Sequence, residues 1–285
     1  MKYSEKDNYI LYLGDVLEIL RQMPSNSVDM TFTSPPYNIG LKDRKDTNIA
    51  TYDNWDDDLN YEQYCEWQLK ILNELYRITK SGGVLFYNHK DKFKEEKYKN
   101  PIEILFKSKW KIKQNIIWDR GSAISYNAGM FGDVYENIYY CYKEISPKTK
   151  TKHNILGTIW RINRETQINH PAPFPLELPL RAIYSIFDDK ENKVILDCFN
   201  GSGTTGVASL LLNHKYIGID ISKKYLDMTI KRLNNYMDES IRGQEEINKH
   251  KVENEYNNKN ITNQTTIFDF IGEEEWVKKV AVFID

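Results

Sequence analysis

A serine, two prolines and a tyrosine stand together in the stretch TSPPYN at residues 33–38. Two prolines cannot continue a β-ladder, so they should fix a rigid, extended turn after the apolar run that precedes them. The Ser34 hydroxyl and the Pro35 carbonyl can accept hydrogen bonds from an NH2 group, Pro36 stiffens the turn, and Tyr37 offers a flat face for stacking. These residues predict a clamp for an amino group attached to an aromatic ring. The alternative is a strand-terminating turn with an exposed tyrosine.

A glycine-rich loop, DCFNGSGTTG at residues 197–206, predicts a nucleoside site. Gly201, Gly203 and Gly206 have the G-x-G-x-x-G spacing that lets a backbone approach a ligand before a helix begins. Asp220 lies 19 residues after Gly201, at the end of the next predicted strand, where a carboxylate can hydrogen-bond ribose hydroxyls. Asp197, the first residue of this stretch, can meet the ammonium group of a methionine moiety. A purely structural turn, or the site of a nicotinamide-dependent dehydrogenase, would also explain the glycines.

Predicted strands and helices alternate around both stretches. Residues 28–32 alternate apolar and polar side chains and predict a strand that runs straight into Ser34. Apolar residues recur at three- and four-residue steps from 64 to 78, which indicates an amphipathic helix ended by the basic, glycine-containing residues 80–83. Further strands are expected at 84–87, 139–142, 194–196 and 216–219, and further helices at 16–22, 174–187, after the glycine loop to 212, and 222–236. This alternation predicts an α/β fold with a mostly parallel sheet and helices on both faces.

Composition and charge are those of an ordinary globular chain, with an uneven charge distribution. Residues 237–285 hold 11 acidic and 6 basic residues, a balance of −5, so the total of −2 leaves +3 for the rest. Residues 90–113 hold nine lysines, which suit phosphate binding, although a solvated lysine face is the alternative. The three cysteines are far apart and predict reduced thiols in a cytoplasmic protein. The chain contains no signal-type start and no apolar run of membrane-spanning length.

The pair TSPPYN and DCFNGSGTTG resembles the amino-methyltransferases that modify N6 of adenine or N4 of cytosine in DNA, whose signatures are (D/N/S)PP(Y/F) and a DPF-x-GSGTT-like loop. The catalytic stretch precedes the cofactor loop by about 160 residues, which resembles the β subgroup of that family. The resemblance covers roughly residues 8–236. Cys198 stands where relatives commonly have proline, and Tyr135–Glu136 stands where many carry His–Glu, so the role of that histidine does not transfer to this chain.

The resemblance implies a Rossmann-like fold that binds S-adenosyl-L-methionine. The implied catalytic residues are Ser34, Pro35, Pro36 and Tyr37, and the implied cofactor residues are Asp15, Asp197, Phe199, Gly201, Ser202, Gly203, Thr204 and Asp220. Asp15 matches the family's Gly-Asp turn and should border the adenine of the cofactor. The target base would be flipped out of double-stranded DNA and methylated directly, without a covalent intermediate or a metal.

The same resemblance divides the chain into three parts. Residues 8–90 and 170–236 form the expected catalytic domain, 91–169 the expected target-recognition region, and 237–285 a polar linker with a small C-terminal element. Ser34 favours cytosine N4 over adenine N6, because adenine enzymes commonly have aspartate there. A catalytically silent DNA-binding subunit and an RNA or protein amine methyltransferase remain the other interpretations. The sequence leaves open whether the chain forms a homodimer and whether a cognate restriction endonuclease accompanies it.

Overall fold

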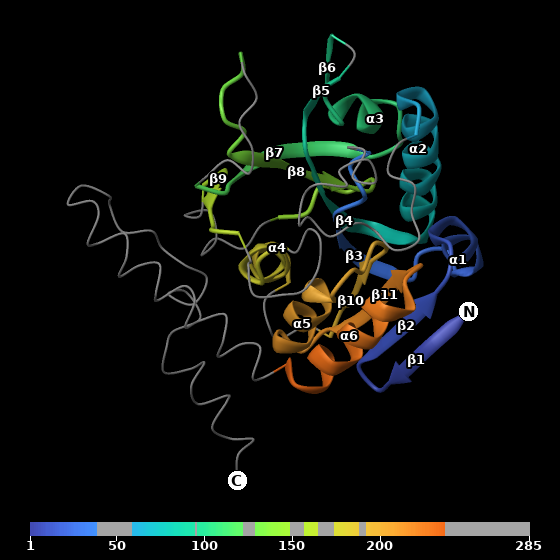
Figure 1. Ribbon diagram of the computed structural model, residues 1–285. Helices are drawn as coiled ribbons and strands as arrows, with labels where there is room; N and C mark the ends of the chain where they lie inside the picture. The colour runs from blue at the N-terminus through green and yellow to red at the C-terminus, as the bar shows by residue number, and fades with distance from the viewer. Residues whose placement is uncertain are drawn as a thin grey trace, which may run out of the picture.

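A nine-stranded mixed sheet runs through the computed structural model, which describes residues 1–38, 59–94, 96–121, 129–148, 157–164, 174–187 and 192–236. The strand order is β1-β2-β11-β10-β3-β4-β8-β7-β9 (Figure 1). Its strands are β1 (Lys2–Lys6), β2 (Tyr9–Leu13), β3 (Val28–Thr33), β4 (Thr79–His89), β7 (Lys111–Asp119), β8 (Tyr135–Tyr142), β9 (Ile159–Arg161), β10 (Val194–Asp197) and β11 (Lys215–Asp220). A separate hairpin pairs β5 (Lys92–Lys94) with β6 (Lys97–Lys99).

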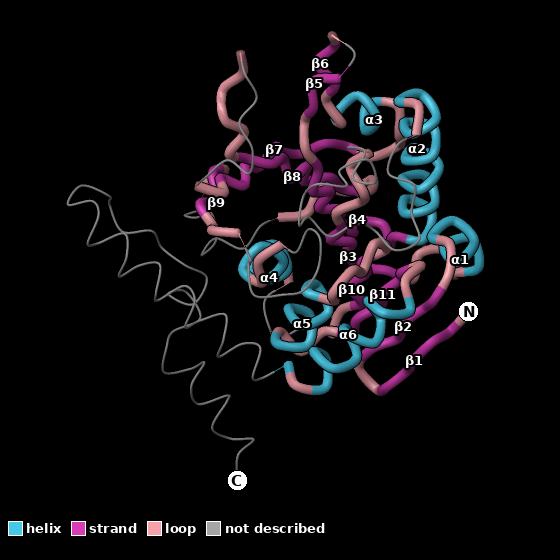
Figure 2. The backbone as a smooth tube through the Cα atoms, in the orientation of Figure 1, coloured by secondary structure: helices cyan, strands magenta, loops and turns pink. Residues whose placement is uncertain are grey.

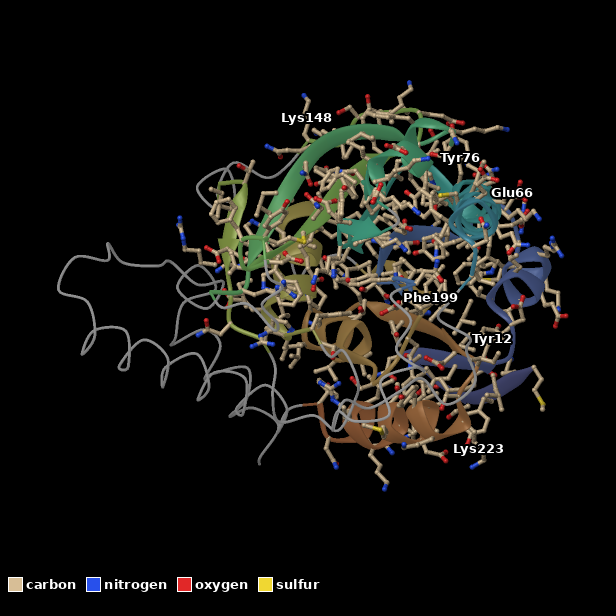
Figure 3. All side chains as sticks on the ribbon, turned by 45° about the horizontal axis from the view of Figure 1, so that its top comes forward. Tyr12, Glu66, Tyr76, Lys148, Phe199 and Lys223 are labelled. Atoms are coloured by element: carbon tan, nitrogen blue, oxygen red, sulfur yellow. The ribbon has the colours of Figure 1, made fainter. Side chains whose placement is uncertain are left out.

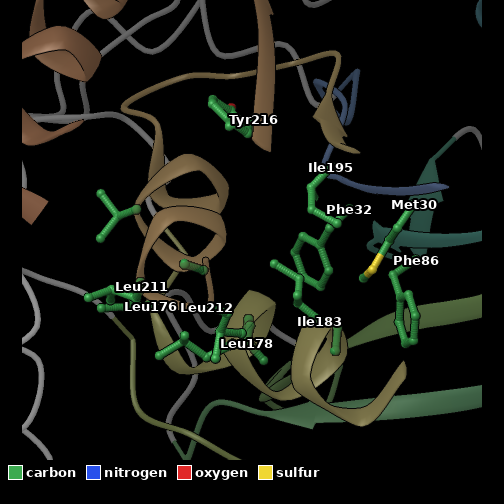
Figure 4. Close-up of a cluster of buried hydrophobic side chains, with 14 of the residues drawn as sticks. Met30, Phe32, Phe86, Leu176, Leu178, Ile183, Ile195, Leu211, Leu212 and Tyr216 are labelled. Carbon is green, nitrogen blue, oxygen red and sulfur yellow. The ribbon is translucent and has the colours of Figure 1, made fainter. Parts of the chain in front are cut away.

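Helices cover both faces of the sheet (Figures 1 and 2). The described helices are α1 (Val16–Gln22), α2 (Tyr61–Ile78), α3 (Ile102–Phe106), α4 (Glu177–Ile186), α5 (Thr204–Leu211) and α6 (Lys223–Asn234). Successive strand residues point to opposite faces: Phe86 packs with residues of α4 and α5, whereas Leu85 packs with residues of α1 and α2. Figure 4 shows the first of these two cores, where Phe32 and Phe86 face Ile183 of α4.

Five of the eight neighbouring strand pairs in this sheet are parallel. The parallel block β2, β11, β10, β3 and β4 brings five carboxyl ends to one side, which we call the carboxyl edge. Strand β8 is antiparallel to β4 and β7, so β8 begins at this edge and β7 ends there. The predicted α/β architecture, with a mostly parallel sheet and helices on both faces, is confirmed.

Residues 80–83 lie inside β4, not in the turn that the sequence predicted after α2. Helix α2 ends at Ile78, and β4 already begins at Thr79. A Cβ on Gly83 would lie 2.5 Å from Thr79 Cγ2 and 2.8 Å from the carbonyl oxygen of Asp29, so the glycine permits a close approach to β3. The expected region 91–169 shares the sheet with the predicted catalytic domain, because β7, β8 and β9 extend it beyond β4. In the described residues, the helices lack the length and apolar composition needed to cross a membrane.

Candidate functional site

The two stretches singled out from the sequence meet at the carboxyl edge, where β3 and β10 lie side by side. Asp197 ends β10 and is fully buried. Its Oδ1 accepts a 2.8 Å hydrogen bond from the Thr33 hydroxyl and a 3.1 Å bond from the Phe199 amide, and its Oδ2 accepts a 2.8 Å bond from the Thr205 hydroxyl. Burial raises the pKa of Asp197 to about 6, although these hydrogen bonds oppose the rise. Asp197 therefore fastens the glycine loop to the residue that precedes Ser34.

The glycine loop is held from behind by α6. Gly203 has a left-handed φ of 81°, and a Cβ there would lie 2.5 Å from Thr229 Cγ2. The buried Arg232 donates to the Ser202 carbonyl at 2.9 Å and to the Thr204 hydroxyl at 3.0 Å. The loop conformation before α5 is therefore fixed by close packing and by buried hydrogen bonds.

Asp220 lies at the end of β11 and faces the same loop. Its Oδ2 accepts from the Gly201 amide at 2.7 Å, and its Oδ1 accepts from the Ser222 amide at 2.8 Å. Burial raises the pKa of Asp220 to about 7, and the two backbone donors oppose that rise. Each carboxylate oxygen has a second lone pair. Asp220 can therefore still accept from a ligand hydroxyl.

Asp15 stands one strand further along the edge. The Gly14 amide donates to the Asp220 carbonyl at 3.0 Å, which joins the two strand ends. The Asp15 side chain caps α1, because its Oδ1 accepts from the amides of Leu17 and Glu18 at 2.9 and 3.0 Å. In Figure 3 the labelled rings of Tyr12 and Phe199 come from the ends of β2 and β10.

Apolar surface surrounds these carboxylates. Ile221, next to Asp220, is 44% exposed, and Phe199 is half-buried in an edge-to-face contact with Trp67 at 5.7 Å between ring centroids. The sequence did not single out Trp67, because it occupies an ordinary apolar position in the helical pattern of α2. Carboxylates beside exposed apolar side chains suit a nucleoside, which has both sugar hydroxyls and a flat base.

The Ser-Pro-Pro-Tyr stretch is part of a polar network that the sequence did not predict. The Tyr37 hydroxyl lies 2.7 Å from the Ser34 hydroxyl and donates to Glu136 Oε2 at 2.8 Å. The Asn88 amide nitrogen donates to the Tyr37 hydroxyl and to Glu136 Oε2, both at 2.9 Å, and lies 3.3 Å from Ser34 Oγ. Arg120 completes the network with a 3.1 Å bond to Glu136 Oε1. Asn88, Glu136 and Arg120 are all buried.

A second chain of hydrogen bonds holds the proline turn. The Tyr64 hydroxyl donates to the Pro36 carbonyl at 2.9 Å and lies 2.6 Å from His89 Nε2. The Tyr64 hydroxyl has one proton and donates it to Pro36, so His89 Nε2 donates to the Tyr64 oxygen. In that neutral ring, His89 Nδ1 accepts from the Lys90 amide at 2.8 Å. Burial lowers the pKa of His89 to about 3, which fits this neutral ring. Tyr37 stacks on that ring at 4.8 Å between centroids.

Position in the fold explains which members of the site the sequence missed. Asn88 and Glu136 come together only because β8 pairs with β4, and Arg120 joins them only because β7 pairs with β8. Glu136 had one signal in the sequence, its place beside Tyr135 where relatives carry His–Glu. Asn88 and Arg120 had none, because each looks like an ordinary polar residue after an apolar strand.

Comparisons with known proteins agree with this geometry. A family model described as DNA methylase matches residues 28–231. The type II methyltransferase M.ScaI of Streptomyces caespitosus is 27% identical over 266 residues, covering 81% of this chain and 83% of the relative. The DNA adenine methyltransferase YhdJ of Escherichia coli K12 is 24% identical over 253 residues, covering 77% and 81%.

Solved structures of similar fold include two methyltransferases. PvuII DNA methyltransferase, described as cytosine-N4-specific, has a TM-score of 0.64 at 18% identity and covers 84% of this chain and 93% of its own. TTHA0409 of Thermus thermophilus, described as a putative DNA modification methylase and complexed with S-adenosyl-L-methionine, has a TM-score of 0.58 at 21% identity and covers 80% and 95%. At these identities the likeness concerns the fold alone.

A sheet covered by helices on both faces, with a glycine loop beside a Ser-Pro-Pro-Tyr turn, defines an α/β methyltransferase. The chain belongs to the DNA methylase family of N6-adenine and N4-cytosine amino-methyltransferases, whose model matches more than half of its length. The family resemblance stated from the two motifs is thereby confirmed.

Proposed function

We propose that this chain transfers a methyl group from S-adenosyl-L-methionine to the exocyclic amino group of a flipped DNA base, with cytosine N4 as the target. The observation that carries the proposal is the Thr33–Asp197 hydrogen bond, which joins the Ser-Pro-Pro-Tyr stretch to the glycine loop. A dehydrogenase would use the same glycine loop but has no use for Ser34, Pro35 and Tyr37 at its edge.

The residues at the loop fit the adenosyl and methionine parts of this cofactor. Asp220 would accept from ribose hydroxyls, Gly201 and Gly203 would bring the backbone close, and Asp15, Phe199 and Ile221 would border the adenine. Asp197, whose oxygens already accept three protein hydrogen bonds, would hold the loop and Thr33 in place and add negative charge near the methionine ammonium. Ser202 and Thr204 would keep the loop in register through Arg232. When bound, the cofactor supplies a methyl group activated by a positive sulfur.

The catalytic stretch would position the base. Ser34 and the Pro35 carbonyl accept hydrogen bonds from the amino group, Pro36 keeps the turn rigid, and Tyr37 stacks on the base. These bonds draw the nitrogen lone pair out of conjugation with the ring, so that it can point at the methyl group. Positioning of this kind can supply a large share of a rate enhancement.

The choice of base rests on Ser34. A hydroxyl is a weaker acceptor than the carboxylate common in adenine enzymes, which favours cytosine. Adenine N6 is the alternative, and the relatives include both an adenine enzyme and a fold neighbour described as cytosine-N4-specific. The test is to incubate the full chain with labelled cofactor and unmethylated plasmid DNA, digest the DNA to nucleosides and separate them by mass. N4-methyldeoxycytidine is the expected product. N6-methyldeoxyadenosine would overturn the base, and no labelled nucleoside would overturn the proposed function.

The DNA would lie against the carboxyl edge. Within residues 90–113, the β5–β6 hairpin directly follows the carboxyl end of β4, whereas Lys111 and Lys113 begin β7 at the opposite edge. The hairpin protrudes beyond the sheet at the top of Figure 1. Phe93 and Tyr98 oppose each other on it and are 55% and 61% exposed.

A second exposed segment, residues 129–135, adjoins the hairpin, and we name the two together the DNA face. Asp91 accepts hydrogen bonds from both Tyr98 and Tyr135, at 2.6 and 3.2 Å, which links the two segments. Phe131 is 102% exposed, and residue 135 leads directly into Glu136 of the catalytic network. Exposed aromatic rings beside lysines suit contacts with bases and phosphates. The DNA face would therefore be the part of the target-recognition region that meets the duplex.

A further inference from the structure

Three oxygen atoms form a directed chain from Ser34 to Glu136. The Ser34 and Tyr37 hydroxyls are 2.7 Å apart, and the Tyr37 hydroxyl is 2.8 Å from Glu136 Oε2. An ionised carboxylate only accepts, so Tyr37 donates its one proton to Glu136. Ser34 must then donate its own proton to the Tyr37 oxygen. Both hydrogen bonds therefore run in the same direction, away from the place where the proposed amino group binds.

Glu136 is held in place by donors at the ends of two neighbouring strands. Arg120 donates to Oε1 at 3.1 Å from the end of β7, and Asn88 donates to Oε2 at 2.9 Å from the end of β4. Two further ion pairs continue from Arg120: Asp133 lies 3.6 Å from Arg120, and Lys90 pairs with Asp133 at 2.6 Å. Since Arg120 binds Oε1, the oxygen that faces the Tyr37 hydroxyl is Oε2.

We propose that Ser34, Tyr37 and Glu136 form a proton relay for the transfer reaction. The inference rests on the proposed function. As the amino nitrogen forms its bond to the methyl carbon, the carbon–sulfur bond breaks and its electron pair stays on sulfur. The nitrogen gives one proton to Ser34 Oγ while the Ser34 proton passes to Tyr37 and the Tyr37 proton passes to Glu136 Oε2. The products are the methylated amine, a neutral thioether and a protonated Glu136, so charge is conserved.

The relay answers a chemical need created by Ser34. An aspartate at this position could keep the amine proton, but a neutral serine hydroxyl cannot, because a protonated alcohol is a strong acid. Glu136 supplies the missing carboxylate two hydrogen bonds away. The Asn88 amide, which donates to both Tyr37 and Glu136, keeps those two oxygens in line.

The test measures single-turnover methyl transfer by the full chain, with S-adenosyl-L-methionine and unmethylated plasmid DNA. Tyr37→Phe keeps the ring stacked on His89 but breaks the relay, and Glu136→Gln keeps an acceptor for Tyr37 that cannot take a proton. Each should slow the transfer by about 100-fold or more with cofactor affinity unchanged. Tyr37→Phe should also keep the melting temperature, whereas Glu136→Gln should lower it, because the buried Arg120 loses its carboxylate partner. The double variant should be no slower than either single variant, because the relay is broken only once.

Tyr140→Phe is the matched control. Its hydroxyl is buried and lacks a hydrogen-bond partner among the described residues, so its removal should leave the rate unchanged. A Tyr37→Phe rate equal to wild type, or single effects that add in the double variant, would overturn the relay while leaving the proposed function intact. A wild-type chain that binds DNA but transfers no methyl group to it would overturn the proposed function, and the relay with it.

Discussion

The Thr33 hydroxyl donates a 2.8 Å hydrogen bond to Asp197 Oδ1 across 164 residues of sequence, and both side chains are fully buried. This bond joins the end of β3 to the end of β10. A hydrogen bond to a buried carboxylate is worth more than one between neutral groups, because the unpaired charge would remain desolvated.

Thr33→Val should lower both stability and methyl transfer. The substitution keeps the side-chain shape but removes a donor to Asp197, and we expect a loss of about 1–3 kcal/mol in the free energy of unfolding. Thr31→Val on the same strand is the control, because the buried Thr31 hydroxyl has no hydrogen-bond partner in the described part of the chain. That change should be neutral or stabilising. Urea unfolding measures the free energy of unfolding of both variants. Equal losses in the two variants would show that the Thr33–Asp197 bond does not stabilise the fold.

Cofactor binding should release a proton from Asp220. Burial raises its pKa to about 7, and ribose hydroxyls that donate to the carboxylate would favour the ionised form. The pKa should therefore fall on binding, so that affinity increases as pH rises from about 6 to about 8. Calorimetry at about pH 6 in buffers of different ionisation enthalpy measures the released proton.

Asp220→Asn should abolish that proton release while Asp197 remains titratable, and Asp220→Ala should weaken cofactor binding by about 1.5–3 kcal/mol. The same raised pKa bears on stability. Between its ordinary value of 3.8 and about 7 the folded chain holds the Asp220 proton more tightly than the unfolded chain, so this contribution to stability is lost as pH rises through that range. An unchanged affinity in a folded Asp220→Ala variant would remove Asp220 from the site.

The sequence predicted most of the elements because their signals are local. The helix predicted at 16–22 is α1 as observed, and in the structure Asp15 caps its first turn. The beginning of β4 was missed because the usual meaning of a Ser-Gly-Gly run is a turn, whereas Gly83 serves a close contact with Asp29 and Thr79 that is visible only once β3 and β4 pair.

Gly206→Ala should destabilise the chain, although alanine favours helix. A Cβ on Gly206 would lie 2.6 Å from the Tyr216 ring and 2.9 Å from Leu233 Cδ2, so α5 would have to move away from β11 and α6. We expect a loss of about 1–3 kcal/mol from overpacking, against a propensity gain of about 1 kcal/mol. Thermal or urea unfolding gives the sign of the change in the free energy of unfolding. A stabilised variant would show that α5 can shift without a loss of stability.

The residues of the candidate site also divide into those with a local signal in the sequence and those without one. Ser34, Tyr37 and Asp220 could be nominated because each lies within or just after a motif whose chemistry is local. Asn88, Arg120 and Glu136 could not, because they meet only through the pairing of β8 with β4 and β7. A residue whose role depends on long-range strand order carries little signal in a single sequence.

The DNA face should make two separable contributions to binding. Lys97, exposed on the hairpin, should contact phosphate, so Lys97→Ala should reduce the slope of log affinity against log salt by about 0.9. Phe131, whose ring is fully exposed, should contact bases, and Phe131→Ala should weaken binding with little change in that slope. Both are measured by titrating an unmethylated plasmid duplex at several salt concentrations.

A basic and an apolar control residue lie at the opposite edge of the sheet. Lys109 precedes the start of β7 and is exposed, and Ile145 follows the end of β8 and is 65% exposed. Both ends are at the edge away from Ser34, because β7 ends and β8 begins at the carboxyl edge. Lys109→Ala and Ile145→Ala should therefore leave the affinity and the salt slope unchanged. If these controls weaken binding as much as Lys97→Ala and Phe131→Ala do, the duplex does not lie across the carboxyl edge, and the target base must reach Tyr37 by another approach.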